Sequence, residues 1–238
     1  MRQRKAKDLE KRMALCEELI LTGFAPETWE TAFARAGDLY LEIGCGKGQF
    51  IIKRALLAPD SNFIGIEGQA TVVLRAAEKA RAVSGKAPWP ENVSGEETLM
   101  ELQGELDNLK LGAGFVDTMD EFFRESQLSG IYLNFSDPWP KERHAKRRLT
   151  HRRRLADYAW AVRDGGFIEF KTDNDGLFDF SLEEFEACGD RLEVVELTRD
   201  LHGKNCTYES RYVTTEYEDK FSSRGKNINY IKVIVNKE

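Results

Sequence analysis

A glycine-rich turn with acidic residues on both sides is the first feature of the sequence that could do chemistry. The segment LEIGCGKGQF places Gly44, Gly46 and Gly48 directly after an apolar run and before an amphipathic one. Glycine lets the backbone bend sharply and approach a ligand closely, and a following helix presents free N–H groups to polar ligand atoms. Glu67 ends the next apolar run, where an acid accepts hydrogen bonds from the ribose hydroxyls of an adenosine cofactor.

Glu42 favours one of the two cofactors that fit such a turn. It lies two residues before Gly44, so its carboxylate is expected beside the turn. A negative charge there would repel the pyrophosphate of NAD, but it would attract the ammonium and sulfonium groups of S-adenosyl-L-methionine (SAM). Position 49 is Gln, so the G-x-G-x-x-G pattern of dinucleotide-binding turns is missing. The turn therefore predicts SAM binding, and a tight turn with no ligand is the alternative.

The segment NFSDPWPKERHAKRRLT (134–150) could hold a substrate. It follows an apolar run, 130–135, at the edge of the sheet where open α/β folds bind ligands. Pro138 and Pro140 make a rigid turn because each fixes its φ angle. Asp137 and Trp139 would thereby be held in place, with the indole able to stack on a base and the carboxylate able to orient it. A plain proline-rich loop is the alternative.

A basic run of residues 141–154 follows at once. It contains eight cations and a single acid, in a chain whose net charge is −6; the cations are Lys141, Arg143, Lys146, Arg147, Arg148, Arg152, Arg153 and Arg154. Such a run is expected to contact the phosphates of a nucleic acid. A solvated helix face is the alternative, although a structural helix would mix both signs of charge.

Two further polar segments lie where strands are expected to end. Asp173 follows Lys171 and Thr172 at the end of one strand, and the segment 215–218, which holds Thr215, Glu216, Tyr217 and Glu218, precedes the last strand. A guanine offers an N1–H and an N2 amino group on one edge, and carboxylates are natural acceptors for these donors. Solvated loops or helix caps are the alternative.

Alternating apolar and amphipathic stretches predict an α/β fold. Strands are expected at 38–44, 62–67, within 108–115, and at 130–135, 165–172, 191–198 and 229–235; helices are expected at 46–58, 69–82, 150–163 and 174–188. Strands that alternate with helices of this length form a doubly wound, mostly parallel sheet. The sequence therefore predicts a Rossmann-like fold with a seven-stranded sheet.

The remaining segments predict the domain organisation. Residues 1–36 are expected to form a basic arm or helix outside the sheet, and residues 37–238 a single domain with an inserted loop at 84–107. The chain has no apolar run of membrane-spanning length and no signal-peptide pattern at its N-terminus. Its four cysteines are scattered and it has three histidines, so we expect free thiols, no metal site and a cytoplasmic monomer or homodimer.

Taken as a set, the motifs resemble those of the bacterial tRNA (guanine-N7)-methyltransferase family, TrmB. The resemblance covers about residues 38–236 and rests on LEIGCGKGQF, FIGIE, FSDPWPKERHAKRRLT, FKTDN and TEYEDKF in that order. It implies a Rossmann-like methyltransferase fold, SAM as the methyl donor, and a guanine in the variable loop of tRNA as the acceptor.

The resemblance also implies roles for individual residues. Glu42, Glu67 and Asp137 match the SAM-side acids of the family. The tRNA-substrate positions correspond to Lys141, Asp173 and the segment 215–218. The RNA-contacting stretch corresponds to Arg143, His144, Lys146, Arg147 and Arg148.

One position departs from the family pattern. Family members usually have an Asp near the end of the third strand, beside the adenine ring, whereas this chain has Phe115 there and Asp117 two residues later. Two arrangements are open: Asp117 takes over through a local shift, or backbone and apolar contacts hold the adenine.

The expected chemistry is simple. Guanine N7 has an available lone pair and no proton, so an in-line methyl transfer needs no general base, and the enzyme contributes position and electrostatics. Asp137 is expected to act catalytically by orienting the base and stabilising the positive charge of the product ring. Two rivals are a SAM-dependent methyltransferase acting on a protein and an RNA-binding protein without activity. An NAD enzyme fits poorly because of Glu42.

Overall fold

We describe a computed structural model of the 238-residue chain, which defines residues 8–91 and 99–237. The first seven residues of the expected N-terminal arm and residues 92–98 of the expected inserted loop lie outside the described residues. The chain divides into two compact units, with the division after Val116. No helix in the described ranges is long and apolar enough to cross a membrane.

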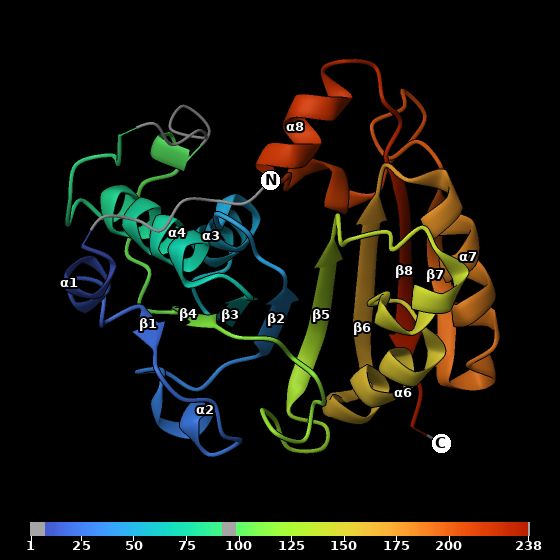
Figure 1. The fold of residues 1–238 in the computed structure, drawn as a ribbon, viewed down its shortest axis with the longest axis horizontal. Helices are drawn as coiled ribbons and strands as arrows, with labels where there is room; N and C mark the ends of the chain where they lie inside the picture. Colours follow the sequence, from blue (N-terminus) through green and yellow to red (C-terminus); the bar gives the residue numbers. More distant parts are fainter. Residues whose placement is uncertain (1–7, 92–98, 238) are drawn as a thin grey trace. The chain divides into compact units, whose positions relative to one another are not determined.

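The first unit is built on a parallel sheet. Its strands are β1 (Ile20–Leu21), β2 (Leu39–Ile43), β3 (Asn62–Glu67) and β4 (Leu109–Ala113). They lie in the order β1-β4-β3-β2, and every neighbouring pair is parallel. Its helices are α1 (Leu9–Ala14), α2 (Thr28–Thr31), α3 (Gln49–Leu57) and α4 (Ala70–Val83). Figure 1 shows α3 and α4 beside these strands, and both helices contact β3 and β4.

The core of the first unit explains why α4 forms where it does. Val73, Ala76, Ala77 and Ala80 recur at helical spacing and are fully buried, and they pack in one cluster with residues of α3, β3 and β4. An apolar stripe of this period is what an amphipathic helix needs to cover a sheet. The small side chains of α4 let it approach its neighbours closely.

The prediction of seven strands is wrong, because the described residues form eight. The additional strand, β1, lies in the segment expected to stay outside the sheet. Ile20 pairs with Leu111 of β4, and the Leu111 N–H donates to the Leu19 carbonyl at 2.7 Å. Leu19 and Ile20 are buried in the core of the first unit, so this part of the arm contributes both a strand and core side chains.

The second unit has a mixed sheet. Its strands are β5 (Leu128–Asn134), β6 (Val162–Thr172), β7 (Leu192–Thr198) and β8 (Asn229–Val235). They lie in the order β5-β6-β8-β7; β5 and β6 are parallel, and β8 is antiparallel to both of its neighbours. The helices are α6 (Arg152–Ala161), α7 (Asp175–Glu186) and α8 (Glu216–Ser222), with short 3-10 helices at Glu142–Arg147, Gly189–Arg191 and Glu209–Tyr212.

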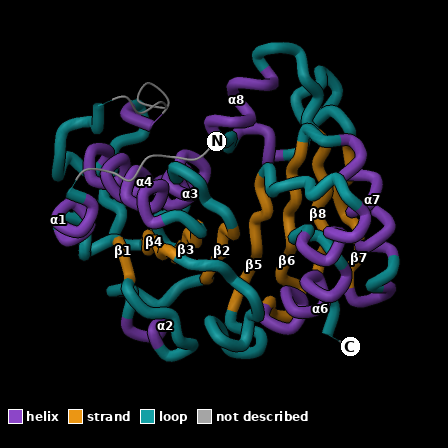
Figure 2. Tube along the Cα trace, in the orientation of Figure 1, coloured by secondary structure: helices purple, strands orange, loops and turns teal. Residues whose placement is uncertain are grey.

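The helices of the second unit lie in two different places. α6 and α7 contact β6 and each other, whereas α8 lies beyond the carboxyl ends of β5 and β6 (Figures 1 and 2). The expected α/β class and the mostly parallel strand pairing are confirmed. The seven predicted strands and the four predicted helices agree with the observed ranges to within a few residues at each end, whereas no range was predicted for β1, α2 or α8.

Candidate active site

The glycine turn after β2 has the geometry that its sequence predicts. Gly44, Gly46 and Gly48 all adopt positive φ angles, of 79°, 54° and 84°. Residues other than glycine rarely adopt such angles. A Cβ atom added at Gly44 or Gly46 would meet nothing within 4 Å, whereas one added at Gly48 would lie 2.7 Å from the Cβ of Ala76. The first two glycines therefore border open space, and the third allows α3 and α4 to pack closely.

Glu67 lies at the carboxyl end of β3, directly beside this turn. Its carboxylate accepts hydrogen bonds from the backbone N–H groups of Gly46 and Gln69, both at 3.2 Å. An ionised carboxylate has about four lone-pair sites, so these two bonds orient the group and leave capacity for further donors. The structure thus holds an oriented acceptor next to the open space at the turn.

Glu42 is more deeply buried than Glu67, the other acid beside the glycine turn. Its side chain is 1% exposed, and it lies on β2 in register with Gly65 of β3. Its position places a carboxylate within the sheet two residues before Gly44. Because a buried charge interacts strongly in low dielectric, this acid favours a cationic ligand group at the turn over an anionic one.

Phe115 follows β4 and is the most exposed aromatic side chain near the turn, at 74%. A Cβ added at Gly68 would lie 2.5 Å from Cε1 of the phenyl ring, so the ring stands against the backbone that directly follows Glu67. Asp117, the other residue proposed for this position, lies in the second unit. Its carboxylate is 3.8 Å from the guanidinium of Arg154.

These features of the first unit fit SAM. The turn offers open space at Gly44 and Gly46, Glu67 offers acceptors for ribose hydroxyls, and Phe115 offers an aromatic face for adenine. Glu42 supplies negative charge for the ammonium and sulfonium groups. Among the described residues, no group of His, Cys, Asp and Glu is arranged to hold a metal ion.

In the second unit, the turn after β5 is held in a strained conformation. Phe135 and Trp139 adopt positive φ angles of 51° and 41°, which persist only where the surroundings enforce them. Arg148 contributes to this, because its guanidinium donates to the carbonyls of Pro138 at 3.1 Å and Trp139 at 3.0 Å. Asp137 is thereby presented on an exposed, fixed loop.

The basic run divides into two parts in the structure. Lys141, Arg143, Lys146 and Arg147 are exposed on or next to the 3-10 helix Glu142–Arg147. Arg147 also lies 4.9 Å from the centroid of the Trp139 ring, and the half-buried ring of His144 meets Trp139 edge-on at 5.7 Å.

Two cations of the later part of the basic run, Arg148 and Arg152, make contacts within the protein, although Arg152 and its neighbour Arg153 are exposed. Besides holding the turn, the Arg148 guanidinium lies 4.2 Å from the centroid of the Phe180 ring. Arg152 makes an ion pair with the buried Glu184 at 2.7 Å. Arg148 therefore has a structural role that the sequence prediction of RNA contact did not include.

Asp173 lies just after β6 and pairs with α8. Its carboxylate accepts a hydrogen bond from the Tyr217 hydroxyl at 3.2 Å. Partial burial raises the pKa of Tyr217, and the negative charge of Asp173 raises it further. The Tyr217 ring stacks on Phe221 at 4.2 Å between centroids and lies 5.0 Å from Phe135. The structure thus joins Asp173 to a partly exposed aromatic cluster.

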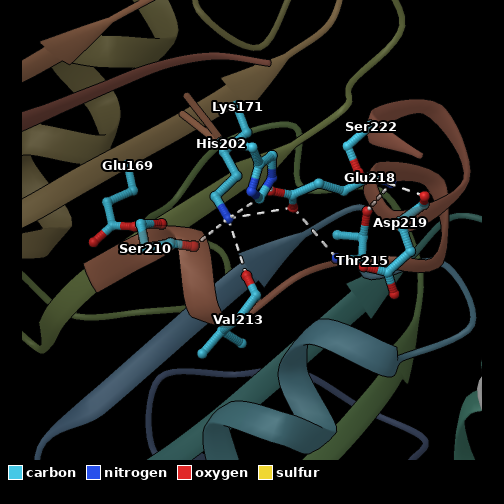
Figure 3. Close-up of polar contacts among 9 residues, drawn as sticks. All are labelled: Glu169, Lys171, His202, Ser210, Val213, Thr215, Glu218, Asp219 and Ser222. Atoms are coloured by element: carbon cyan, nitrogen blue, oxygen red, sulfur yellow. Dashed lines mark hydrogen bonds and ion pairs between the residues drawn. The ribbon is translucent and has the colours of Figure 1, made fainter. Parts of the chain in front are cut away.

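Glu218 is placed differently from the other predicted substrate residues. Its side chain is fully buried, with its carboxylate bonded to Lys171 and to His202 (Figure 3). Thr215 caps α8 and forms a capping box with Glu218, and Glu216 lies in the first turn of the helix. Direct contact between Glu218 and a guanine edge does not fit this arrangement.

Sequence reasoning missed the partners of Glu218, which are Lys171 and His202. A signal for Lys171 was present: Glu169 and Lys171 are charged residues two positions apart in the apolar strand FIEFKT, so they share one face of the strand. Charges on a buried strand face need partners. His202 carries no comparable signal.

Similarity to solved structures bears on the fold. The 16S rRNA methyltransferase KamB aligns with a TM-score of 0.58 at 13% identity, covering 90% of this chain and 94% of that one. The aminoglycoside resistance methyltransferase NpmB1 aligns with a TM-score of 0.54 at 16% identity, covering 89% and 94%. At such low identity the likeness shows a shared methyltransferase fold.

Sequence relatives are much closer. The profile of a family described as putative methyltransferase (Methyltransf_4) matches residues 36–231. The tRNA (guanine-N(7)-)-methyltransferase of Limosilactobacillus reuteri (strain DSM 20016) is 43% identical, over 87% of this chain and 85% of its own length. The enzyme of the same name from Bacillus subtilis (strain 168) is 40% identical, over 84% and 82%. The chain therefore belongs to the tRNA (guanine-N(7)-)-methyltransferase family.

Proposed function

We propose that this SAM-dependent methyltransferase transfers a methyl group to N7 of a guanine in the variable loop of tRNA. The observation that carries the cofactor assignment is the open glycine turn, with the oriented carboxylate of Glu67 beside it. The printed names of the relatives support the substrate and the methylated atom. A tRNA substrate supports a cytoplasmic location for the enzyme.

Residues of the first unit hold the cofactor in this proposal. Glu67 accepts hydrogen bonds from the ribose hydroxyls, Phe115 stacks on the adenine, and Glu42 attracts the cationic end. Bound SAM supplies an electrophilic methyl group on a sulfonium sulfur. The exposed ring of Phe115 favours stacking over the alternative in which Asp117 takes the place of the usual family Asp.

Residues of the second unit hold the guanine. Asp137 orients the base and stabilises the positive charge that develops in its ring as N7 is methylated. Asp173, fixed by the Tyr217 hydroxyl, accepts hydrogen bonds from N1–H and the N2 amino group. N7 carries no proton, so the reaction needs no general base, and these side chains act through position and charge.

The exposed part of the basic run binds the RNA backbone. Lys141, Arg143, Lys146 and Arg147 contact phosphates, with His144 beside them, and each contact adds salt-dependent affinity without reading sequence. Arg148 acts indirectly by holding the carbonyls of Pro138 and Trp139.

A labelled-methyl assay tests the proposal against its rivals. SAM carrying a labelled methyl group is incubated with the enzyme, undermodified tRNA and a protein extract together. We expect the label in tRNA. Label in protein would show the other substrate class, and SAM binding too weak to measure by calorimetry would identify a non-catalytic RNA-binding protein.

Charge-reversal variants test the RNA surface separately. The double variant Lys146→Glu/Arg147→Glu should weaken tRNA binding at low salt and make the slope of log affinity against log salt shallower. The matched control is Lys204→Glu/Lys226→Glu, which makes the same charge change outside the basic run. Equal loss of affinity in both variants would contradict a specific role for the run.

A further inference from the structure

Two charged residues of β6, and the acid that directly follows the strand, hold the segment that carries Tyr217. Glu169 and Lys171 are two residues apart on β6, so they share one face of the strand, and Asp173 comes directly after its last residue. The Glu169 carboxylate accepts a hydrogen bond from the Ser210 hydroxyl at 2.9 Å, and Asp173 accepts one from Tyr217 at 3.2 Å. Lys171 lies between Glu169 and Asp173 along the chain.

Lys171 is the centre of this arrangement (Figure 3). Its side chain is fully buried, and its ammonium donates to the carbonyls of Ser210 at 2.7 Å and Val213 at 2.9 Å. It also donates to both carboxylate oxygens of Glu218, at 3.3 Å and 3.2 Å. One buried cation therefore joins β6, the 3-10 helix Glu209–Tyr212 and α8.

Glu218 completes the arrangement from the side of α8. Its carboxylate accepts from the Thr215 N–H at 3.4 Å and bonds to the imidazole Nε2 of His202 at 2.8 Å. An ionised carboxylate only accepts, so the His202 nitrogen is the donor in this bond. His202 is partly exposed, which makes it the member of the group that can be changed with the least damage to the core.

The energetics favour a role in positioning over one in stability. Burying two charges removes them from water, and replacing a buried ion pair by uncharged residues of similar volume is often neutral or stabilising. What such residues would not reproduce is the directional set of bonds that fixes the start of α8 against β6. That set determines where the Tyr217 hydroxyl lies relative to Asp173.

We propose that Lys171, Glu218 and His202 are positioning residues for the methyl acceptor. They hold the segment 215–217 against β6, so that Asp173 and Tyr217 meet the guanine nucleotide in one fixed arrangement, and they themselves do not touch the substrate. The inference rests on the proposed function and extends it to residues outside the contact surface.

The first test removes both buried charges together. In Lys171→Met/Glu218→Gln, neither charge is left without its partner, so we expect a folded protein with a thermal midpoint above that of Lys171→Met alone. The SAM dissociation constant, measured by calorimetry, should stay within about twofold. The value of kcat/KM for tRNA should fall roughly ten- to a hundredfold, the scale expected of a misplaced substrate.

The second test uses His202, whose change does not depend on the core tolerating a new residue. His202→Leu removes the donor to Glu218, and His202→Gln retains an N–H donor. We expect the first variant to lower kcat/KM for tRNA several-fold with an unchanged KM for SAM, and the second to restore most of the loss. The exposed pair Arg199–Asp179 supplies a control: Arg199→Met/Asp179→Asn should leave both parameters unchanged.

The outcomes separate this inference from the proposed function. A folded double variant with wild-type tRNA kinetics, or equal activity of the two His202 variants, would overturn the positioning role. Parallel losses in SAM affinity and tRNA kinetics would also overturn it, since they indicate general damage. Failure of the wild-type enzyme to methylate tRNA would instead refute the proposed function.

Discussion

Replacing Phe115 with alanine should weaken SAM binding and leave the fold intact. The phenyl ring is 74% exposed in the structure, so its removal takes little buried surface from the core and should change the free energy of unfolding by less than about 0.5 kcal/mol. Loss of one aromatic ring that stacks on a base costs about 1–3 kcal/mol. For Phe115→Ala we expect a loss of SAM binding free energy in the lower part of this range, about 1–2 kcal/mol, because one edge of the ring already contacts Gly68.

This free energy corresponds to a roughly five- to thirtyfold higher dissociation constant for SAM, at about 1.4 kcal/mol per factor of ten. Calorimetry with SAM and with S-adenosylhomocysteine measures it. Both ligands carry the adenine, so both should weaken by the same factor, and Phe115→Trp should retain most of the affinity.

Tyr212 supplies a matched control, because it is also a strongly exposed aromatic residue, at 72%, but lies in the second unit. Tyr212→Ala should leave SAM binding unchanged. Wild-type affinity of Phe115→Ala for both ligands would refute the stacking argument and would return the adenine contact to another residue.

Three other predictions concern substitutions of single residues. Gly48→Ala places a Cβ 2.7 Å from that of Ala76 at a φ angle of 84°, so it should destabilise the fold by about 2–4 kcal/mol; an unchanged thermal midpoint would contradict this packing. Asp137→Ala should lower the single-turnover methyl-transfer rate roughly ten- to a hundredfold with unchanged SAM affinity, and an unchanged rate would remove its catalytic role. The hydrogen bonds of Arg152 hold the pKa of Glu184 below its ordinary value of 4.5. A carboxyl whose pKa is lower in the folded state stabilises the fold at pH values above its unfolded-state pKa, and this stabilisation is lost as the pH falls. Denaturant unfolding should therefore show the advantage of wild type over Glu184→Gln shrinking as pH falls below about 4.5, and a constant difference would contradict the pairing.

Local patterns were sufficient to predict most of the fold and the glycine turn with Glu67 beside it. Gly44, Gly46 and Gly48 indicate a turn because glycine readily adopts the positive φ angles that such a turn requires. Glu67 ends an apolar strand next to this turn. These features depend on residues close together in sequence. β1 escaped prediction for the opposite reason: it has two residues, too few to show the alternation of a strand, and Leu19 and Ile20 also fit a helical spacing.

The residues proposed for tRNA binding depend on contacts between positions far apart in the sequence. The sequence shows Glu218 as an acid in a polar segment, but it pairs with Lys171, 47 positions away. The pattern of FIEFKT indicates that Lys171 needs a partner, but no local pattern reveals that the partner is Glu218. Arg148 likewise looks like its exposed neighbours in the basic run, yet its guanidinium holds two backbone carbonyls. The sequence predicts a cluster of positive charges, but only the tertiary structure shows which of these side chains face solvent.

The central claim is tested most directly by identifying the methylated nucleoside. Undermodified tRNA is incubated with the enzyme and labelled SAM, then digested to nucleosides and analysed by chromatography and mass spectrometry. The account predicts that the label is found in 7-methylguanosine from the variable loop. Label in another nucleoside, or no label in tRNA, would contradict it.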